Sequence, residues 1–381
     1  MQPRHPTVPF PSARPQPTYE ADAYAKSLPG MVTRESRAAH APLRPPVVDA
    51  PAPASDATRT LLVADASCDL PEAWLATHQV LTLPLRIRTA SDSVTDGRSA
   101  SDVARRRAFL AASMDIGVVM QRSIALSVAG TEELIAAQLN DGADFVLAIT
   151  QAARRSAVHG NTLAAAQNLM QRVTQARQRQ ASRHQAPARP FKIWVVDGDA
   201  ANHATAVLLC EAQRLLAAGE RLPQVVQRLD ALRRDVQTIV LPADLRHLHA
   251  QSATQADTPL SWLSYGVDRM LNRTPVLRFA AHRVDVLAHH RGQTEAMDAT
   301  LRWTAQQVSA GLAAPHVCVS VAGDTDAVGD GEGWAVLAAT CRDYGVALHL
   351  ATMSISNALA LGRGAIAIAL APKKSPRRLS R

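Results

Sequence analysis

The chain has 381 residues, of which 47% are hydrophobic and 4% aromatic, and its formal net charge is +8. This length allows two domains with sizeable cores, and no segment approaches the ~18 uninterrupted apolar residues of a membrane span. The four cysteines show no Cys-x-x-Cys spacing, and each lies in or beside an apolar run. We therefore expect buried, reduced thiols in a cytoplasmic protein without a signal peptide.

The positive charge is concentrated in two segments. The C-terminal tail has five Lys or Arg residues and no acid, and residues 172–189 contain five arginines and no acid. Residues 1–57 contribute +1, which leaves the rest of the chain with a net charge of −3. A body of that charge is not typical of a nucleic-acid surface, so we expect no nucleic-acid partner. Both segments are interpreted as solvated; weak contact with RNA or an anionic lipid is the alternative.

Residues 1–57 hold 12 of the 23 prolines and little apolar periodicity, which predicts a disordered leader. Strands and helices then alternate. Strands are predicted at 61–64, 80–87, 145–149 and 193–196, and helices at 72–77, 99–112, 131–139, 156–179 and 201–217. This alternation predicts an α/β domain at 58–224 built on a mostly parallel, doubly wound sheet. Pro84 interrupts the second strand, which indicates an edge or a bend.

The second half of the chain has a different pattern, which predicts a mixed sheet. A hairpin is predicted from strands at 275–279 and 284–288. Further strands are predicted at 238–241, 317–321, 346–351 and 365–370, and helices at 225–234, 245–248, 294–312 and 332–344. We expect a second α/β domain at 225–372, with a mixed sheet and helices, followed by a disordered basic tail at 373–381.

The run VADASCDLP, from Val63 to Pro71, is the most informative stretch for function. Asp65, Ser67 and Asp69 directly follow an apolar strand, and Pro71 can open a helix. In α/β proteins the carboxyl ends of the strands hold ligands. This run is therefore the expected edge of a ligand site.

The run resembles a motif of the DegV family of fatty-acid-binding proteins, in which a strand ends in Thr-Asp-Ser-Thr-x-Asp-Leu-Pro. Asp65, Ser67 and Asp69 to Pro71 fit this motif, whereas Ala64 and Ala66 do not. Other family runs are matched in the same order, so that the resemblance covers roughly residues 60–371. These matches are Leu83–Leu85, Asp96-Gly97, Leu271–Leu277, Arg291 and Gly362–Ile368.

The resemblance implies two α/β domains that enclose one long-chain fatty acid, and a protein that is not itself an enzyme. It also implies a possible kinase partner, a separate subunit to which the acyl carboxylate is presented. Burial of a sixteen-carbon chain at ~0.8 kcal/mol per methylene offers about 10 kcal/mol. Polar groups must meet the carboxylate, because its desolvation otherwise cancels much of that gain.

The sequence departs from the family where head-group hydroxyls are expected. The family's Thr-Ser-Gln-Pro-Ser loop is matched by residues 119–123, without the Thr-Ser pair, and Ala360 stands where the family has a histidine. The family's Ser-Gly-Thr-Tyr turn is matched by residues 154–157, where only the hydroxyl of Ser156 is kept. The residues predicted to meet the head group are Ser67, Gln121, Ser123, Arg154, Arg155 and Ser156.

Arg154 and Arg155 have two interpretations. Placed at a helix N-terminus, a guanidinium adds to the backbone amides of an anion site. The alternative is a pair of exposed arginines beside a helix start. Correspondingly, either the head-group site is rebuilt, or the chain is an interaction or regulatory protein with a vestigial pocket, whose leader and tail are the working parts.

We expect no metal and no cofactor. The pairs His247/His249 and His289/His290 have no Cys or acid at metal-ligand spacing. The sequence contains no P-loop, HExxH or GxSxG motif, so a phosphotransferase is only a third hypothesis.

Overall fold

The computed structural model describes residues 59–88, 93–112, 122–139, 142–154, 156–185, 187–198, 203–243, 273–280 and 283–373. All of these belong to one compact unit, Ser55–Arg381. The predicted leader, most of the predicted tail and the predicted helix at 245–248 lie outside the described residues. No helix in the described ranges is both long enough and apolar enough to cross a bilayer.

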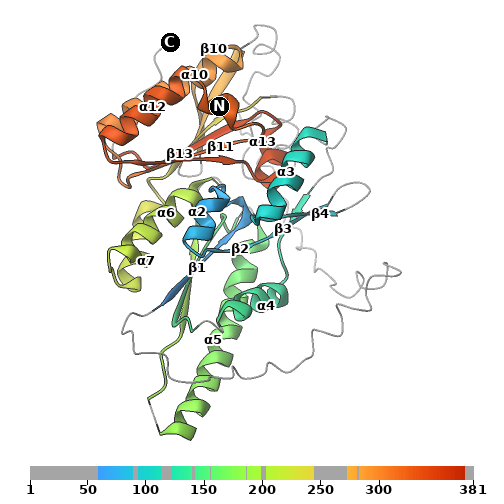
Figure 1. Ribbon diagram of the computed structural model, residues 1–381, viewed down its shortest axis with the longest axis vertical. Helices are drawn as coiled ribbons and strands as arrows, with labels where there is room; N and C mark the ends of the chain where they lie inside the picture. The colour runs from blue at the N-terminus through green and yellow to red at the C-terminus, as the bar shows by residue number, and fades with distance from the viewer. Residues whose placement is uncertain are drawn as a thin grey trace, which may run out of the picture. The chain divides into compact units, whose positions relative to one another are not determined.

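Sheet A organises the first half of the chain and is fully parallel, in the order β2-β1-β6-β7 (Figure 1). Its strands are β1 (Thr60–Asp65), β2 (Leu81–Leu83), β6 (Phe145–Thr150) and β7 (Lys192–Asp197). The last four residues of β1 and the last five of β6 are buried without alternation. Such continuous burial is typical of strands covered on both faces.

Helices cover both faces of sheet A, which confirms the predicted doubly wound architecture. Val63, Val146 and Ala148 face α4 (Val128–Leu139) and α5 (Ala157–His184), whose Ile135 and Leu169 belong to the same core cluster. The strand residues between these, such as Leu62 and Leu147, point to the opposite face of the sheet. They pack against a second group of helices, α2 (Glu72–Thr77), α6 (Ala204–Ala217) and α7 (Leu222–Leu232).

Pro84 separates two strands that belong to different sheets, so the single strand predicted at 80–87 is wrong. The short strand β2 ends at Leu83, and β3 (Leu85–Arg88) enters an antiparallel sheet B with the order β4-β3-β5. Proline has no backbone N–H and cannot continue a ladder. The other strands of sheet B, β4 (Ser93–Asp96) and β5 (Arg122–Ile124), were not predicted. The helix α3 (Ala100–Ala112), which follows β4, agrees with the helix predicted at 99–112.

Sheet C organises the second half and is mixed, as predicted, with the order β10-β9-β8-β13-β11-β12. Its strands are β8 (Gln237–Leu241), β9 (Arg273–Ala280), β10 (Arg283–Arg291), β11 (His316–Val321), β12 (Ala347–Thr352) and β13 (Ile366–Leu370). β9 and β10 form the predicted antiparallel pair, whereas β11 and β12 are parallel.

One face of sheet C packs on α10 (Gly292–Ala310) and α12 (Glu332–Asp343) (Figure 1). The short helices α11 (Asp326–Gly329) and α13 (Ile355–Leu361) were not predicted. On the other face, Cys318 of β11 and Ala369 of β13 share a core cluster with α6. Because α6 also packs on β1 and β6, its residues Ala204 to Ala212 are all buried. This helix is the main apolar link between sheets A and C.

The helix α7 contains the predicted domain border. It packs on α6 and β7, whereas the next strand, β8, belongs to sheet C. The division into 58–224 and 225–372 stays a prediction.

The arginines of the basic segment at 172–189 are partly neutralised: Arg172 lies 2.8 Å from Glu132, and Arg177 and Arg189 lie 3.3 and 2.8 Å from Asp144.

Gly198, directly after β7, tests how closely the strand ends are packed. Its N–H donates to the backbone oxygen of Thr150, and an added Cβ would lie 2.7 Å from that oxygen. We expect Gly198→Ala to destabilise the protein by about 1–3 kcal/mol in urea unfolding. Gly160→Ala is the control, because Gly160 is exposed on α5 with nothing within 4 Å of the added Cβ; it should stabilise by about 0.5–1 kcal/mol. Equal effects would contradict the close packing.

Candidate ligand site at the strand ends

The carboxyl end of β1 turns into a short, buried 3₁₀ helix that Asp65 caps. One carboxylate oxygen of Asp65 accepts a hydrogen bond from the Ser67 backbone N–H at 2.9 Å, and the Ser67 hydroxyl donates to the same oxygen. The other oxygen accepts from the Gln151 N–H, 2.7 Å away, at the end of β6. Asp65 therefore ties the ends of β1 and β6 together.

Asp69 ends this turn in the left-handed conformation, with φ 47°, and points at the second half of the chain. Its carboxylate pairs with Arg98, accepts from the backbone N–H of Ser354 at 2.8 Å, and accepts from the side chain of Asn357 at 3.0 Å. Nε2 of His203, at the start of α6, lies 3.3 Å from the same carboxylate. All of these groups are buried.

Arg98 is the most connected side chain of this region. Besides pairing with Asp69, it donates from Nε to the Ala66 backbone oxygen at 2.8 Å and from Nη1 to the Thr352 oxygen at 3.0 Å. The first acceptor follows β1, and the second ends β12 of sheet C. A single guanidinium thus joins the turn after β4 to both halves of the protein.

A second carboxylate–arginine group supports the first. Arg106 of α3 is fully buried, and it donates to Glu72 at 2.6 Å and to the Gly97 backbone oxygen at 2.5 Å. Asp96 accepts from the Ser356 N–H at 2.9 Å, at the start of α13. The Asp96-Gly97 turn, which matches a family motif, therefore positions α13 against α3.

The three buried aspartates differ in their pKa values. Burial raises the pKa of Asp65, despite its hydrogen bonds from Ser67 and Gln151, and burial also raises the pKa of Asp96, despite the nearby Arg98. Burial alone would raise the pKa of Asp69 too, but the Arg98 guanidinium, with His203, outweighs it and holds that pKa well below its usual range. Asp69 is therefore the firmly ionised member of the group.

Among the predicted head-group residues, the structure describes four. Ser67 is fully buried, and its hydroxyl is engaged by Asp65. Ser156 caps α5 by accepting from the Val158 N–H at 3.2 Å. Arg154 is exposed just before that cap, and Ser123 is exposed on β5. Gln121 and Arg155 lie outside the described residues, and the head-group role of all six stays a prediction.

The segment that follows Ser123 is held beside the helix that Ser156 begins. The Asn161 side chain, in the second turn of α5, donates to the Leu126 backbone oxygen at 2.6 Å. This contact brings the end of β5 and the start of α5 to one region, and places Ser123 and Ser156 on segments that adjoin each other.

Two polar side chains at the strand ends were missed by the sequence analysis. Gln151 follows β6, and Thr205 lies in the first turn of α6. Both are buried, and neither the Gln151 side-chain nitrogen nor the Thr205 hydroxyl has a hydrogen-bond partner among the described residues. The rule that singles out Asp65, a polar residue directly after a buried strand, also applies to Gln151.

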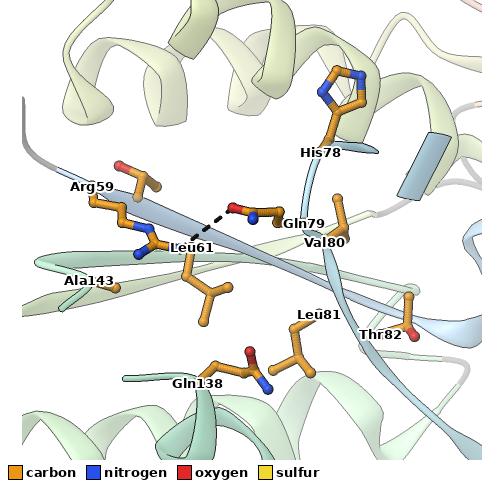
Figure 2. A pocket seen from close by; sticks show the side chains of 10 residues that line it. Arg59, Leu61, His78, Gln79, Val80, Leu81, Thr82, Gln138 and Ala143 are labelled. Carbon is orange, nitrogen blue, oxygen red and sulfur yellow. Dashed lines mark hydrogen bonds between the residues drawn. The ribbon is translucent and has the colours of Figure 1, made fainter. Parts of the chain in front are cut away.

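One cavity among the described residues lies away from these strand ends. It measures about 400 Å³ and lies at the amino-terminal edge of sheet A (Figure 2). Its lining residues come from the start of β1, the approach to and start of β2, and α4; they include Leu61, His78, Leu81 and Gln138. An Arg59–Gln79 contact of 3.5 Å crosses it. None of the four described head-group residues lines this cavity, and it therefore adds nothing to the candidate site.

Replacing Asp69 tests the buried ion pair. Asp69→Asn keeps the side chain's shape but removes the closest counter-charge of the buried Arg98 guanidinium and leaves only the more exposed Glu72, 3.6 Å from Nη1; we expect a loss of about 3–5 kcal/mol in urea unfolding. Asp298→Asn is the matched control, because Asp298 forms a 2.7 Å pair with Arg302 in which both side chains are about 40% exposed. Its loss should stay below about 1 kcal/mol. Similar losses in both variants would contradict the arrangement.

The same pair predicts a pH dependence. The pKa of Asp69 is lower in the folded state than its ordinary value of 3.8, so its contribution to stability is complete above that value and is lost as the pH falls toward the folded pKa. The stability difference between wild type and Asp69→Asn should thus be constant above about pH 5 and shrink between about pH 4 and pH 2. Asp65 and Asp96 are present in both proteins, so their contributions cancel apart from the smallest cause of the raised Asp65 pKa, which is the charge of Asp69. A difference that grows in acid would contradict the assignment.

Comparison with known proteins shows the family. The profile of the DegV family, described as "Uncharacterised protein, DegV family", matches residues 59–373. A DegV domain-containing protein of Xanthomonas axonopodis pv. citri is 26% identical over 310 residues, which cover 81% of this chain and 96% of the relative. A Xanthomonas campestris pv. campestris protein of the same description matches with the same identity and coverage.

Solved DegV structures share the fold. A DegV lipid binding protein of Thermotoga maritima superposes with a TM-score of 0.61 at 16% identity, over 83% of this chain and 99% of that one. A fatty-acid-binding DegV family protein of Thermus thermophilus gives 0.58 at 20% identity, over 82% and 99%. At these identities the likeness shows the fold alone. The profile match spans the whole body described above, and the chain therefore belongs to the DegV family.

Proposed function

We propose that this protein binds a long-chain fatty acid, or a similar amphipathic anion, in a cleft between its two α/β domains. Family membership supports this, as do the solved relatives, several of which are described as binding fatty acids. The proposed position of the carboxylate is the carboxyl edge of sheet A, where α/β proteins hold their ligands.

The observation that carries the proposal is the pair of buried donors on Gln151 and Thr205 that have no partner within the described part of the chain. A Cβ on Gly198 would meet both the Thr150 oxygen, at 2.7 Å, and the Thr205 hydroxyl, at 3.1 Å, so Thr205 lies beside the residue that directly precedes Gln151 in the chain. A buried donor without an acceptor costs about 1–3 kcal/mol. A ligand carboxylate supplies acceptors for both.

The predicted head-group residues complete the proposed site from neighbouring segments. Ser156 begins α5, a helix of 28 residues whose first backbone amides favour an anion. Arg154 precedes it, and Ser123 lies on the adjoining β5. We propose that Gln121 and Arg155 contribute in the same region. Ser67 acts through Asp65, since its hydroxyl already donates there.

The proposal includes presentation of the bound carboxylate to a separate kinase subunit, as the family resemblance implies. It assigns no catalytic residue, metal or nucleic acid to this function. A cytoplasmic location is also proposed, and four free, buried cysteines support it.

Extraction of lipid tests the proposal. The full chain, purified without detergent from a bacterial host, is denatured, extracted with organic solvent and measured by mass spectrometry. We expect about one fatty acid per chain, because an apolar chain gains ~0.8 kcal/mol per buried methylene and is retained through purification. Absence of lipid, together with no uptake of labelled fatty acid by the delipidated protein, would overturn the proposal and favour the interaction protein with a vestigial pocket.

Variants of the delipidated protein locate the carboxylate. Gln151→Leu and Ser156→Ala should each weaken fatty-acid binding about tenfold or more, since hydrogen bonds to charged groups contribute about 1.5–3 kcal/mol. Gln237→Leu is the matched control. The side-chain oxygen of Gln237 is also buried and unpartnered among the described residues, but Gln237 is the first residue of β8, at an amino-terminal strand end rather than a carboxyl-terminal one. Unchanged binding in Gln151→Leu and Ser156→Ala would move the head group elsewhere.

A further inference from the structure

Three side chains with metal-binding atoms meet where α6 packs on sheet C. They are Cys210 of α6, His316 of β11 and His349 of β12, and their ligand atoms lie within 4.8 Å of one another. Cys210 and His316 are 2% and 6% exposed, and His349 is partly buried. This cluster takes no part in the candidate fatty-acid site.

The strand register explains why the two histidines face the helix together. β11 and β12 are parallel, with Cys318 opposite His349. His316 and Cys318 are two residues apart on β11, so they share a face with His349. That face packs on α6, where Cys318 and Cys210 belong to one core cluster. One thiol and two imidazoles therefore converge from α6, β11 and β12.

His316 is not accounted for as an ordinary core residue. Neither ring nitrogen makes a hydrogen bond within the described residues, although Nε2 lies 3.4 Å from a carboxylate oxygen of Glu211. Glu211 is held in turn by Arg214 at 2.7 Å and Arg228 at 3.5 Å. Histidines that bind metals commonly donate their other ring N–H to a carboxylate of this kind.

The donor set selects the type of ion. Imidazole nitrogen and thiolate sulfur are the usual ligands of Zn²⁺, with bonds of about 2.0–2.1 Å and 2.3 Å. A tetrahedral ion with those bonds separates its ligand atoms by roughly 3.3–3.8 Å. The observed spacing within 4.8 Å needs only small side-chain adjustments to reach that geometry.

We propose that Cys210, His316 and His349 form a Zn²⁺ site with three protein ligands, and that Glu211 is the carboxylate that orients His316. The ion would join α6, which packs on sheet A, to the edge pair β11–β12 of sheet C. This inference does not depend on fatty-acid binding.

Metal titration of the untagged full chain, kept reduced with a phosphine, tests the proposal. We expect one Zn²⁺ per chain and a rise in the thermal midpoint of about 5 °C at a hundredfold excess over Kd. Co²⁺ in place of Zn²⁺ should give a thiolate-to-cobalt charge-transfer band, which identifies sulfur among the ligands. A wild-type protein that binds no Zn²⁺, or binds Co²⁺ without this band, overturns the site.

Variants assign the ligands. Cys210→Ser and His349→Gln should each lower Zn²⁺ affinity roughly 100-fold or more. Cys341→Ser and His290→Gln are matched controls, because they replace a buried thiol on α12 and a buried imidazole on β10 away from the cluster; they should leave affinity within about twofold. Unchanged affinity in Cys210→Ser and His349→Gln, or equal losses in the controls, contradicts the assignment. The wild-type cobalt spectrum decides the case if a variant does not fold.

Discussion

The arrangement of the two halves depends on the hydrogen bonds that the buried ion pair of Asp69 and Arg98 makes to residues 352–357. Arg98 has no exposed side-chain surface, and its remaining donors reach the backbone oxygens of Ala66 and Thr352. Such a pair contributes little net stability compared with an apolar contact, because both charges are desolvated. Its value is specificity: any other placement of sheet C leaves the pair without the Thr352 oxygen that Arg98 reaches and without the Ser354 and Asn357 donors that Asp69 accepts from.

The apolar contact through α6 and the polar contact through Arg98 have different roles. The burial of α6 between sheets A and C supplies a non-directional driving force. Hydrogen bonds from Ser354 and Asn357 to Asp69 fix the position of α13, since they have narrow angular requirements. The strand ends of sheet A therefore meet the second half in one defined geometry, which a binding site requires.

Most helices and buried strands could be predicted from the sequence, because their signals are local. The helix at 72–77 was predicted with the bounds that the structure has, and β6 and β13 are continuous apolar runs. β4 and β5 have four and three residues and no comparable apolar run. Pro84 was recognised as an interruption, but the change of sheet depends on which strands pair, and that information is non-local.

For the candidate sites too, local features could be predicted from the sequence and non-local contacts could not. The position of Asp65, Ser67 and Asp69 at a strand end was predicted, but that Asp65 would engage the Ser67 hydroxyl depends on burial that a motif does not show. Gln151 could have been found, because it directly follows a buried strand. The cluster of Cys210, His316 and His349 could not, since its members are far apart in the chain and only the pairing of β11 with β12, packed on α6, brings them together.

The order of strands in sheet C has a consequence for synthesis on the ribosome. β13 lies between β8 and β11 and pairs with both, although it is the last strand of the described chain. Until residues 366–370 emerge from the exit tunnel, no backbone hydrogen bonds of the sheet join β8, β9 and β10 to β11 and β12. The second half must therefore complete its folding after nearly all of the body has been translated, with nascent strand edges open to chaperones until that moment.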